Sequence, residues 1–163
     1  MAKWRNEIER NNYSDLVFSR IGRLLYVGSL FETNCKIIDT KLSPYIIDAN
    51  KDKLDEFFEK FGKASLNNSI NRTFKNEEEF RKILHEGRLV RNEIAHQLLL
   101  EFYVIEADQN KKEDFEKKMR NMALILVRAY LFSLDILDYV FKQNRTESDI
   151  KSVIDWIFND QLS

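Results

Sequence analysis

Apolar residues recur every three or four positions along most of this chain, which is the period of one face of an α-helix. Between residues 15 and 42 the spacing 3-4-3-4-3-4 connects Ile21, Leu24, Gly28, Phe31, Cys35, Ile38 and Leu42. Such spacing is typical of the seam of a helix packed near-antiparallel in a bundle. We therefore expect a long helix over 15–42, with Ser14 as its N-cap and Pro44 just past its end.

The second half of the chain shows the same period over a longer segment. Residues 111–143 carry a seam spaced 4-3-4-3 at Phe115, Met119, Met122, Leu126, Ala129, Ser133, Ile136 and Val140. A second apolar line, with members seven residues apart, runs through Ile125, Phe132 and Tyr139. A helix that is apolar on two sides is central in its domain or buried in a dimer.

Shorter apolar segments predict further helices. We expect one over 3–11 and an amphipathic one over 51–61, with Asn50 as its cap and Gly62 as its stop. A last helix over 147–159, capped by Thr146, would direct inward Ile150, Val153, Ile154, Ile157 and Phe158. The stretch 67–73 is polar and shows no period, which indicates a surface loop, either a connection or a substrate-contacting flap.

One further helix, from Asn76 to about residue 103, carries both histidines of the chain. Asn76 is its expected N-cap, and the three glutamates that follow suit the positive N-terminal end of a helix dipole. Its core stripe consists of Phe80, Ile83, Gly87, Val90, Ile94 and Leu98. Gly87 within that stripe suits the close approach of a neighbouring helix.

The composition favours the same architecture. Four Gly and one Pro in 163 residues are few turn formers, which favours an all-α fold over a sheet-rich one. No repeat, low-complexity tract or linker interrupts the pattern. We expect a single domain over 1–163, an up-and-down helical bundle of four to six helices.

Charge and cysteine content narrow the classes of function. The net charge of −1 excludes a polycation, so contact with a nucleic acid needs a local basic surface. Cys35 is the only cysteine, so no disulfide framework exists, and its place on the seam indicates a small buried residue. The N-terminus lacks the apolar core of a signal peptide, and the most apolar window, 122–141, is broken by charges. We expect a cytoplasmic protein without metal, cofactor or membrane span.

The segment 91–96, Arg-Asn-Glu-Ile-Ala-His, has the chemistry needed to hold and cleave a phosphodiester. Arginine stays protonated and matches a phosphate with a planar fork of donors. Histidine is the side chain whose unperturbed pKa allows it to take and give protons near neutrality. Only two histidines occur in the chain, His85 and His96.

Helical geometry separates these residues from the predicted core. At about 100° per residue, with His85 at zero, Asn92 falls near −20°, His96 near +20° and the core stripe near 190°. Arg91 falls near 240°, beside the core face. Apolar side chains also lie on the polar side, at Leu89, Leu99 and Leu100. An apolar flank of this kind favours a partner surface, and we expect dimerisation through the face that carries His96.

Basic side chains gather on the same helix, at Arg81, Lys82, Arg88 and Arg91. They predict a phosphate-binding patch, diluted by Glu86 and Glu93. His85 lies about 16 Å from His96 along the helix axis, too far to share one phosphate within a monomer. We interpret His85 as a surface histidine rather than a catalytic one.

Arg91-Asn92-x-x-x-His96, on a long helix of an all-α bundle, resembles the R-x4-6-H motif of HEPN domains, in which Asn often follows the Arg. The resemblance implies a metal-independent endoribonuclease, often a toxin or antiphage effector, that works as a dimer with the motifs of both subunits facing each other. A cognate antitoxin or regulatory protein is a further expected partner.

The resemblance also implies roles for individual residues. Arg91 would hold or polarise the scissile phosphate, and Asn92 would orient the phosphate or His96. His96 would act as general acid or base while a ribose 2′-OH attacks its own phosphate, which leaves a 2′,3′-cyclic phosphate and a 5′-OH. The basic patch is a separate prediction from charge, by which Arg88, Arg81 and Lys82 would contact the RNA from the flank.

Two features keep other interpretations open. Many HEPN toxins of two-gene systems continue the motif as His-x-Tyr, whereas here the third position is Leu98 and the nearest downstream tyrosine is Tyr103. The same Arg-Asn-x-x-Ala-His string resembles the mannitol-repressor-like branch of these helical proteins, for which regulation or scaffolding is presumed. A non-catalytic regulatory module is therefore the alternative, and a structural bundle with a chance motif is a third.

Overall fold

The computed structural model describes residues 12–42, 65–105, 109–142 and 149–159. These residues form α1 (Asn12–Leu42), α3 (Leu66–Thr73), α4 (Glu78–Glu93), the π-helical turn η3 (Ile94–Leu98), α5 (Leu99–Ile105), α6 (Gln109–Phe141) and α7 (Ile150–Phe158). The described part of the chain contains helices and no strand, so the all-α bundle is confirmed. The helices expected over 3–11 and 51–61 lie outside the described residues.

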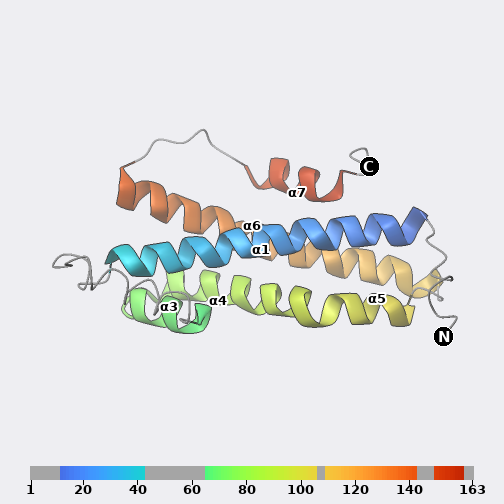
Figure 1. Ribbon diagram of the computed structural model, residues 1–163, viewed down its shortest axis with the longest axis horizontal. Helices are drawn as coiled ribbons and strands as arrows, with labels where there is room; N and C mark the ends of the chain where they lie inside the picture. Colours follow the sequence, from blue (N-terminus) through green and yellow to red (C-terminus); the bar gives the residue numbers. More distant parts are fainter. Residues whose placement is uncertain (1–11, 43–64, 106–108, 143–148, 160–163) are drawn as a thin grey trace, which may run out of the picture.

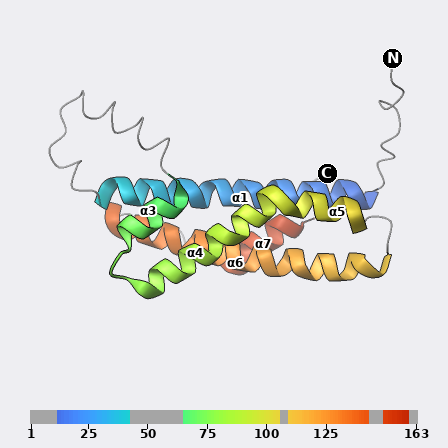
Figure 2. The same ribbon diagram turned by 90° about the horizontal axis from the view of Figure 1, so that it is seen from below.

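The long helices lie side by side in a bundle (Figure 1). α1 and α6 run in the same direction, because Arg20 bonds Glu116 near one end of the pair and Asn34 bonds Ser133 further along. The continuous rod α4–η3–α5 runs antiparallel to both and crosses obliquely over them (Figure 2). α7 packs against α6 and α1 from another side. The near-antiparallel packing expected for α1 therefore applies to its contact with α4–η3–α5.

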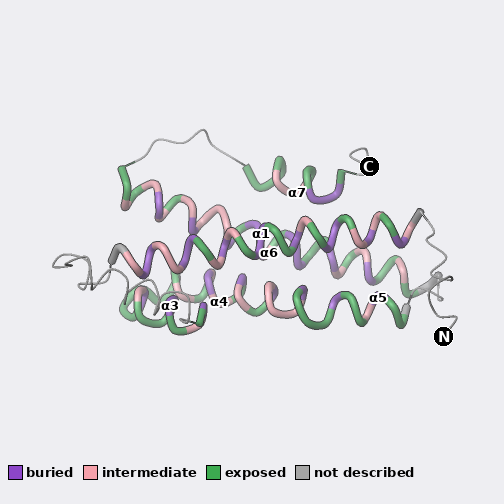
Figure 3. Tube along the Cα trace, viewed as in Figure 1, coloured by how far each residue is buried: buried purple, intermediate pink, exposed green. Residues whose placement is uncertain are grey.

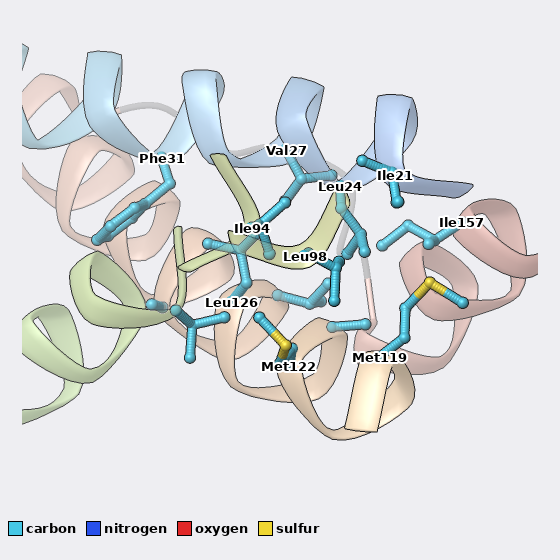
Figure 4. Close-up of a cluster of buried hydrophobic side chains, with 14 of the residues drawn as sticks. Ile21, Leu24, Val27, Phe31, Ile94, Leu98, Met119, Met122, Leu126 and Ile157 are labelled. Carbon is cyan, nitrogen blue, oxygen red and sulfur yellow. The ribbon is translucent and has the colours of Figure 1, made fainter. Parts of the chain in front are cut away.

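The predicted seams form the core. On α1 every described seam residue from Ile21 to Ile38 is buried, including Cys35 at 1% exposure. On α6 the seam is buried from Phe115 to Ser133, and α6 contacts α1, α4, α5 and α7, which confirms its central place. Buried positions recur along both helices (Figure 3), and their side chains meet those of η3 and α7 in one cluster (Figure 4). Burial raises the pKa of the Cys35 thiol, as expected for an unreactive packed residue.

The polar stretch 67–73 is not a loop, as its sequence predicted, but lies within helix α3. Ser65 caps α3, because its hydroxyl accepts a hydrogen bond from the Asn68 backbone N–H. Leu66 and Ile70, one turn apart, bury one side of α3 against α1. Arg72 pairs with Asp39 of α1. Tertiary packing therefore stabilises a helix that the asparagine-rich composition disfavours.

Three predicted helix caps were also wrong. α1 already includes Ser14, which is buried rather than capping. α4 begins after Glu77 rather than Asn76, and α7 begins after Asp149, whose carboxylate accepts from the Ser152 N–H. Short polar residues near a helix start compete as caps, and packing decides among them.

Some positions assigned to the core lie at its edge instead. Phe80 is 39% exposed and packs edge-on against Phe132, with 5.0 Å between ring centroids. Tyr139, the last member of the second apolar line on α6, is 87% exposed, and Ile150 of α7 is 37% exposed. These residues lie near the ends of their helices, where fewer neighbouring elements are available to cover them.

Gly87 is a point of close approach between α4 and α6, as its place in the stripe predicted. A Cβ built on Gly87 would lie 2.3 Å from the Cβ of Ala129 and 3.3 Å from the Phe31 ring. No other side chain fits here, so the two helices meet with backbone against a methyl group. This contact holds the helix that carries the histidines against the centre of the bundle.

Candidate functional site

The motif lies where α4 changes to a π-helical turn. η3 begins at Ile94, directly after Glu93, and includes His96. The Ile94 N–H is shared between the carbonyls of Arg91 and Val90. π-helical turns close on i→i+5 hydrogen bonds, occur mostly as single turns within α-helices, and are frequent at functional sites.

The π turn alters the angular relation of the motif residues. On an α-helix Arg91 and His96, five positions apart, would point about 140° away from each other. Each residue of a π turn advances by less than the α-helical angle, so η3 turns His96 towards the side of Arg91. The π turn therefore begins after Arg91 and carries the exposed imidazole of His96.

A sequence signal for this turn exists in the buried line Val90, Ile94, Leu98 and Phe102, in which each step is four residues. Three such steps would rotate the line by about 40° each on a regular α-helix. The local unwinding keeps the line against the core. The prediction that treated the whole helix as α-helical did not use this signal.

Arg91 is anchored on α1. Its Nη2 donates to Oε2 of Glu32 at 2.5 Å, and its Nη1 donates to Oδ1 of Asn92 at 3.2 Å. The aliphatic stem crosses Gly28, where a Cβ would lie 3.0 Å from the Arg91 Cγ. Glu32 also pairs with Lys36 at 2.8 Å. The guanidinium is therefore oriented and partly neutralised, and two of its five N–H donors are occupied by these bonds.

Asn92 and His96 share the outer side of the rod but do not bond each other. Asn92 is half-buried beside Arg91, whereas His96 is exposed. Among the described residues no side chain or backbone group forms a hydrogen bond or ion pair with the His96 ring. An imidazole in this position is free to meet a ligand.

The predicted flanking cations occupy the other end of α4. Arg88 donates from Nε to Nδ1 of His85 at 3.2 Å, and His85 Nε2 lies 2.9 Å from Oδ1 of Asn71 on α3. Arg81 donates to the backbone carbonyl of Lys75 at 3.3 Å. Lys82, the third predicted RNA contact, follows Arg81 in the helix and is exposed.

His85 is more strongly engaged than a plain surface histidine. Its pKa is lowered by partial burial and by the charges of Arg88 and Arg81, so the neutral ring is favoured. Since Nδ1 accepts from Arg88, the neutral ring carries its proton on Nε2 and donates it to Asn71. Asn71 was not predicted here, because its segment was interpreted as a loop.

The two acidic residues expected to dilute the basic patch differ in their surroundings. Glu93 pairs with Lys118 of α6 at 2.8 Å, and the same ammonium donates to Glu101 at 2.6 Å. These bonds to Glu101 and Glu93 raise the pKa of Lys118. Glu86 is exposed. Because Lys118 is shared between two carboxylates, it offsets only part of the charge of Glu93.

Large exposed apolar side chains precede and follow His96 along the rod. The predicted leucines are exposed there, and two further residues join them, so that the apolar surface comprises Leu89, Leu99, Leu100, Tyr103 and Val104. Leu100 and Val104 are 67% and 75% exposed. We call these five residues the apolar rim.

Within the described residues no group of three or more His, Cys, Asp or Glu side chains could hold a metal ion. Nor does the described part of the chain contain a helix long and apolar enough to span a membrane. In comparisons with known proteins, no protein-family model, curated protein or solved structure matches this chain.

Proposed function

We propose that this protein is a metal-independent endoribonuclease of HEPN type, a toxin or antiphage effector that cleaves single-stranded RNA in the cytoplasm. The observation that carries the proposal is the exposed His96 ring on the π turn that follows the oriented Arg91–Asn92 pair. An oriented cation and an exposed imidazole on one rod are the groups that RNA cleavage requires. Neither needs a metal or cofactor, because RNA supplies its own nucleophile.

In the proposed reaction His96 takes the proton of a ribose 2′-OH or gives a proton to the leaving 5′-oxygen, and water exchanges the other proton. The 2′-oxygen bonds to the adjacent phosphorus while the bond from phosphorus to the 5′-oxygen breaks. The products are a 2′,3′-cyclic phosphate and a 5′-OH. Arg91 stabilises the charge that develops on the phosphate oxygens, and Asn92 holds the guanidinium in place.

We further propose that the site is completed by a second copy of the chain. The apolar rim lies on the same rod as His96 and is the type of surface that a symmetric interface buries. If the apolar rims of two copies packed together, one His96 from each copy would lie at the interface. Enclosing the phosphate there would strengthen its interactions with both arginines, because water is displaced.

One observation favours the alternative, a non-catalytic regulatory or binding module. The guanidinium of Arg91 already faces the Glu32 carboxylate, which competes with a phosphate for the same donors. In a module of that kind Arg91 would join α4 to α1, and His96 with the apolar rim would bind a regulatory protein or nucleic acid without cleavage.

Incubation of the purified protein with labelled single-stranded RNA in EDTA distinguishes the two. We expect cleavage products that end in a 2′,3′-cyclic phosphate, and at least a hundredfold slower cleavage by His96→Ala, the usual order for loss of a general acid or base. Gln97→Ala is the matched control, since Gln97 is exposed on the same turn. Absence of wild-type cleavage, or equal rates for His96→Ala, contradicts the nuclease proposal.

Arg91 is tested with two variants because it also contacts α1. Arg91→Ala removes the phosphate-holding cation together with the Glu32 pair, whereas Arg91→Lys retains a charge without the planar fork. Circular dichroism of both variants separates lost folding from lost chemistry. A folded Arg91→Lys protein that cleaves at the wild-type rate contradicts the role given to the fork.

A further inference from the structure

A second arrangement of polar groups lies at the start of α4, about 16 Å along the rod from His96. Arg81, His85 and Arg88 follow the spacing 4-3, so they share one side of the helix. Asn71 of α3 reaches the same place and bonds the His85 ring. These four residues from two helices are here called the α3–α4 cluster.

The cations of this cluster differ from several others in the bundle. Three basic side chains that reach another helix have carboxylate partners there: Arg20 bonds Glu116, Arg72 bonds Asp39 and Lys118 bonds Glu101. Arg23 of α1 is an exception, since it donates to backbone carbonyls at the end of α7. Arg88 instead bonds a neutral imidazole and Arg81 a neutral backbone carbonyl. Neither arginine forms an ion pair with any carboxylate of the described residues.

The Asn71–His85–Arg88 chain of hydrogen bonds orients the Arg88 guanidinium without removing its charge. Asn71 accepts from His85 Nε2, which leaves the Nδ1 lone pair to accept from Arg88 Nε. The remaining N–H groups of Arg88 are available for oxygen ligands. An anionic ligand would supply the opposite charge that these neutral groups do not provide.

Four glutamates lie near the cluster. Glu77 is the N-cap of α4, and Glu78 and Glu79 lie in its first turn, where the helix dipole favours negative charge. Glu77 and Glu78 stand four and three residues before Arg81, on the same side of the helix, whereas Glu86 lies about 100° from His85 around it. Among the described residues none of the four forms an ion pair with Arg81 or Arg88. Both guanidinium groups of the cluster therefore remain without a carboxylate partner.

We propose that the α3–α4 cluster is a second phosphate-binding subsite, which holds the RNA strand several nucleotides away from the bond cleaved at His96. The proposal rests on the proposed function for the identity of the anion. Arg81 and Arg88 are the phosphate contacts, and His85 and Asn71 are positioning residues that orient Arg88. Asn92 lies between this cluster and His96 on the same rod, so one extended strand can follow the helix from one to the other.

The test measures RNA binding separately from cleavage. In a His96→Ala background, fluorescence anisotropy with a labelled single-stranded RNA gives Kd and its dependence on salt. We expect Arg88→Ala and Arg81→Ala each to weaken binding roughly tenfold. The association constant falls as the salt concentration rises, and each substitution should make this dependence less steep. On a plot of log K against log salt the magnitude of the slope should decrease by about 0.7, the value for one lost contact to a single strand. Lys151→Ala is the matched control, since Lys151 is exposed on α7 and should leave both quantities unchanged.

The positioning residues need a different readout. His85→Phe keeps the ring but removes both ring nitrogens, so Arg88 loses its acceptor. We expect weaker binding with a salt slope close to that of Arg88→Ala, whereas His85→Gln, which retains an acceptor oxygen, should restore part of the affinity. Equal binding by His85→Phe and His85→Gln overturns the positioning role.

The outcomes separate this inference from the nuclease proposal. Binding that depends on Arg81 and Arg88 without any cleavage by the wild-type protein supports the subsite and removes the proposed reaction. Cleavage by the wild-type protein with binding and salt slope unchanged in Arg81→Ala and Arg88→Ala overturns the subsite and leaves the reaction standing. No measurable RNA binding overturns the subsite.

Discussion

The guanidinium of Arg91 on α4 faces the carboxylate of Glu32 on α1, with 2.5 Å between Nη2 and Oε2. This pair links the candidate phosphate-holding residue to the bundle and also provides its nearest competitor for a phosphate. Glu32 is shared with Lys36, so its charge is divided between two cations. The balance at Glu32 therefore controls how much of the charge of Arg91 is available to a ligand.

Replacing Glu32 with Gln should increase RNA cleavage severalfold. Glutamine retains an acceptor oxygen for Arg91 but removes the negative charge that competes with phosphate. The half-buried pair contributes on the order of 1 kcal/mol, so urea denaturation should show a loss of about that size in the free energy of unfolding. Lys36→Met removes the other partner of Glu32 and should lower the cleavage rate, because the charge of Glu32 then acts on Arg91 alone. A folded Glu32→Gln protein with a lower rate would show that the carboxylate positions Arg91 productively instead.

Replacing Leu100 with Glu should convert a dimer into a monomer and abolish cleavage. Leu100 lies in the apolar rim at 67% exposure, so the substitution should change the free energy of unfolding of one chain by less than about 0.5 kcal/mol. A charge in a buried symmetric contact would appear once from each copy, which disfavours association. Sedimentation velocity measures the oligomeric state.

Tyr139→Glu is the control for this prediction, since Tyr139 is 87% exposed on α6 outside the apolar rim. We expect it to remain a dimer and to cleave RNA at the wild-type rate. A wild-type protein that sediments as a monomer and still cleaves RNA rules out the composite site.

Replacing Gly87 with Ala should destabilise the protein. The added Cβ would lie 2.3 Å from the Cβ of Ala129, and neither atom can rotate away, so α4 and α6 must separate. Overpacking of this kind costs about 1–3 kcal/mol, against which alanine regains up to about 1 kcal/mol of helix propensity. The net loss should appear as a lower midpoint of urea denaturation.

Gly22→Ala provides the opposite expectation on α1. No atom lies within 4 Å of a Cβ built there, so only the gain in helix propensity applies, about 0.5–1 kcal/mol. Equal effects of the two substitutions would contradict the close approach at Gly87.

The pKa of His85 should be measurably lower than the usual 6.5, because burial and the charges of Arg88 and Arg81 disfavour the imidazolium. A group with a lowered folded-state pKa binds protons more readily when unfolded. The contribution of His85 to stability is therefore complete above about pH 6.5 and declines as the pH falls from there through the folded-state pKa.

NMR titration of the His85 ring measures this pKa directly, and Arg88→Met should raise it. In His85→Gln the free energy of unfolding should lose this part of its pH dependence. An unchanged pH profile in that variant, or a ring that titrates at or above 6.5 in the wild-type protein, would contradict the assignment.

Residue spacing was sufficient to predict the bundle, its two long helices and the buried seams. The reason is that burial of one apolar face repeats with the helical period and leaves that period in the sequence. Gly87 could be identified in the same way, since a glycine in an apolar stripe has few uses other than close packing. Residues near helix ends, such as Phe80 and Tyr139, were placed too deep because spacing carries no information on where the covering helices stop.

In the candidate site, too, some features could be predicted from the sequence and others could not. Arg91, Asn92 and His96 could be identified from their chemistry and order, and the placement of His96 on the outer surface follows from the opposing apolar stripe. The partners of these residues could not be predicted. Glu32 lies 59 positions before Arg91 in the chain, and Asn71 reaches His85 only because α3 forms and packs on α1.

The sequence by itself thus determines the helical content and the side of each long helix that faces inward, because both follow from the local spacing of apolar residues. The pairing of Arg91 with Glu32 and the bond from His85 to Asn71 depend on contacts between different helices. Such contacts are selected by geometry and by the cost of leaving buried or charged groups without partners. They exist only once α1, α3 and α4 have packed together.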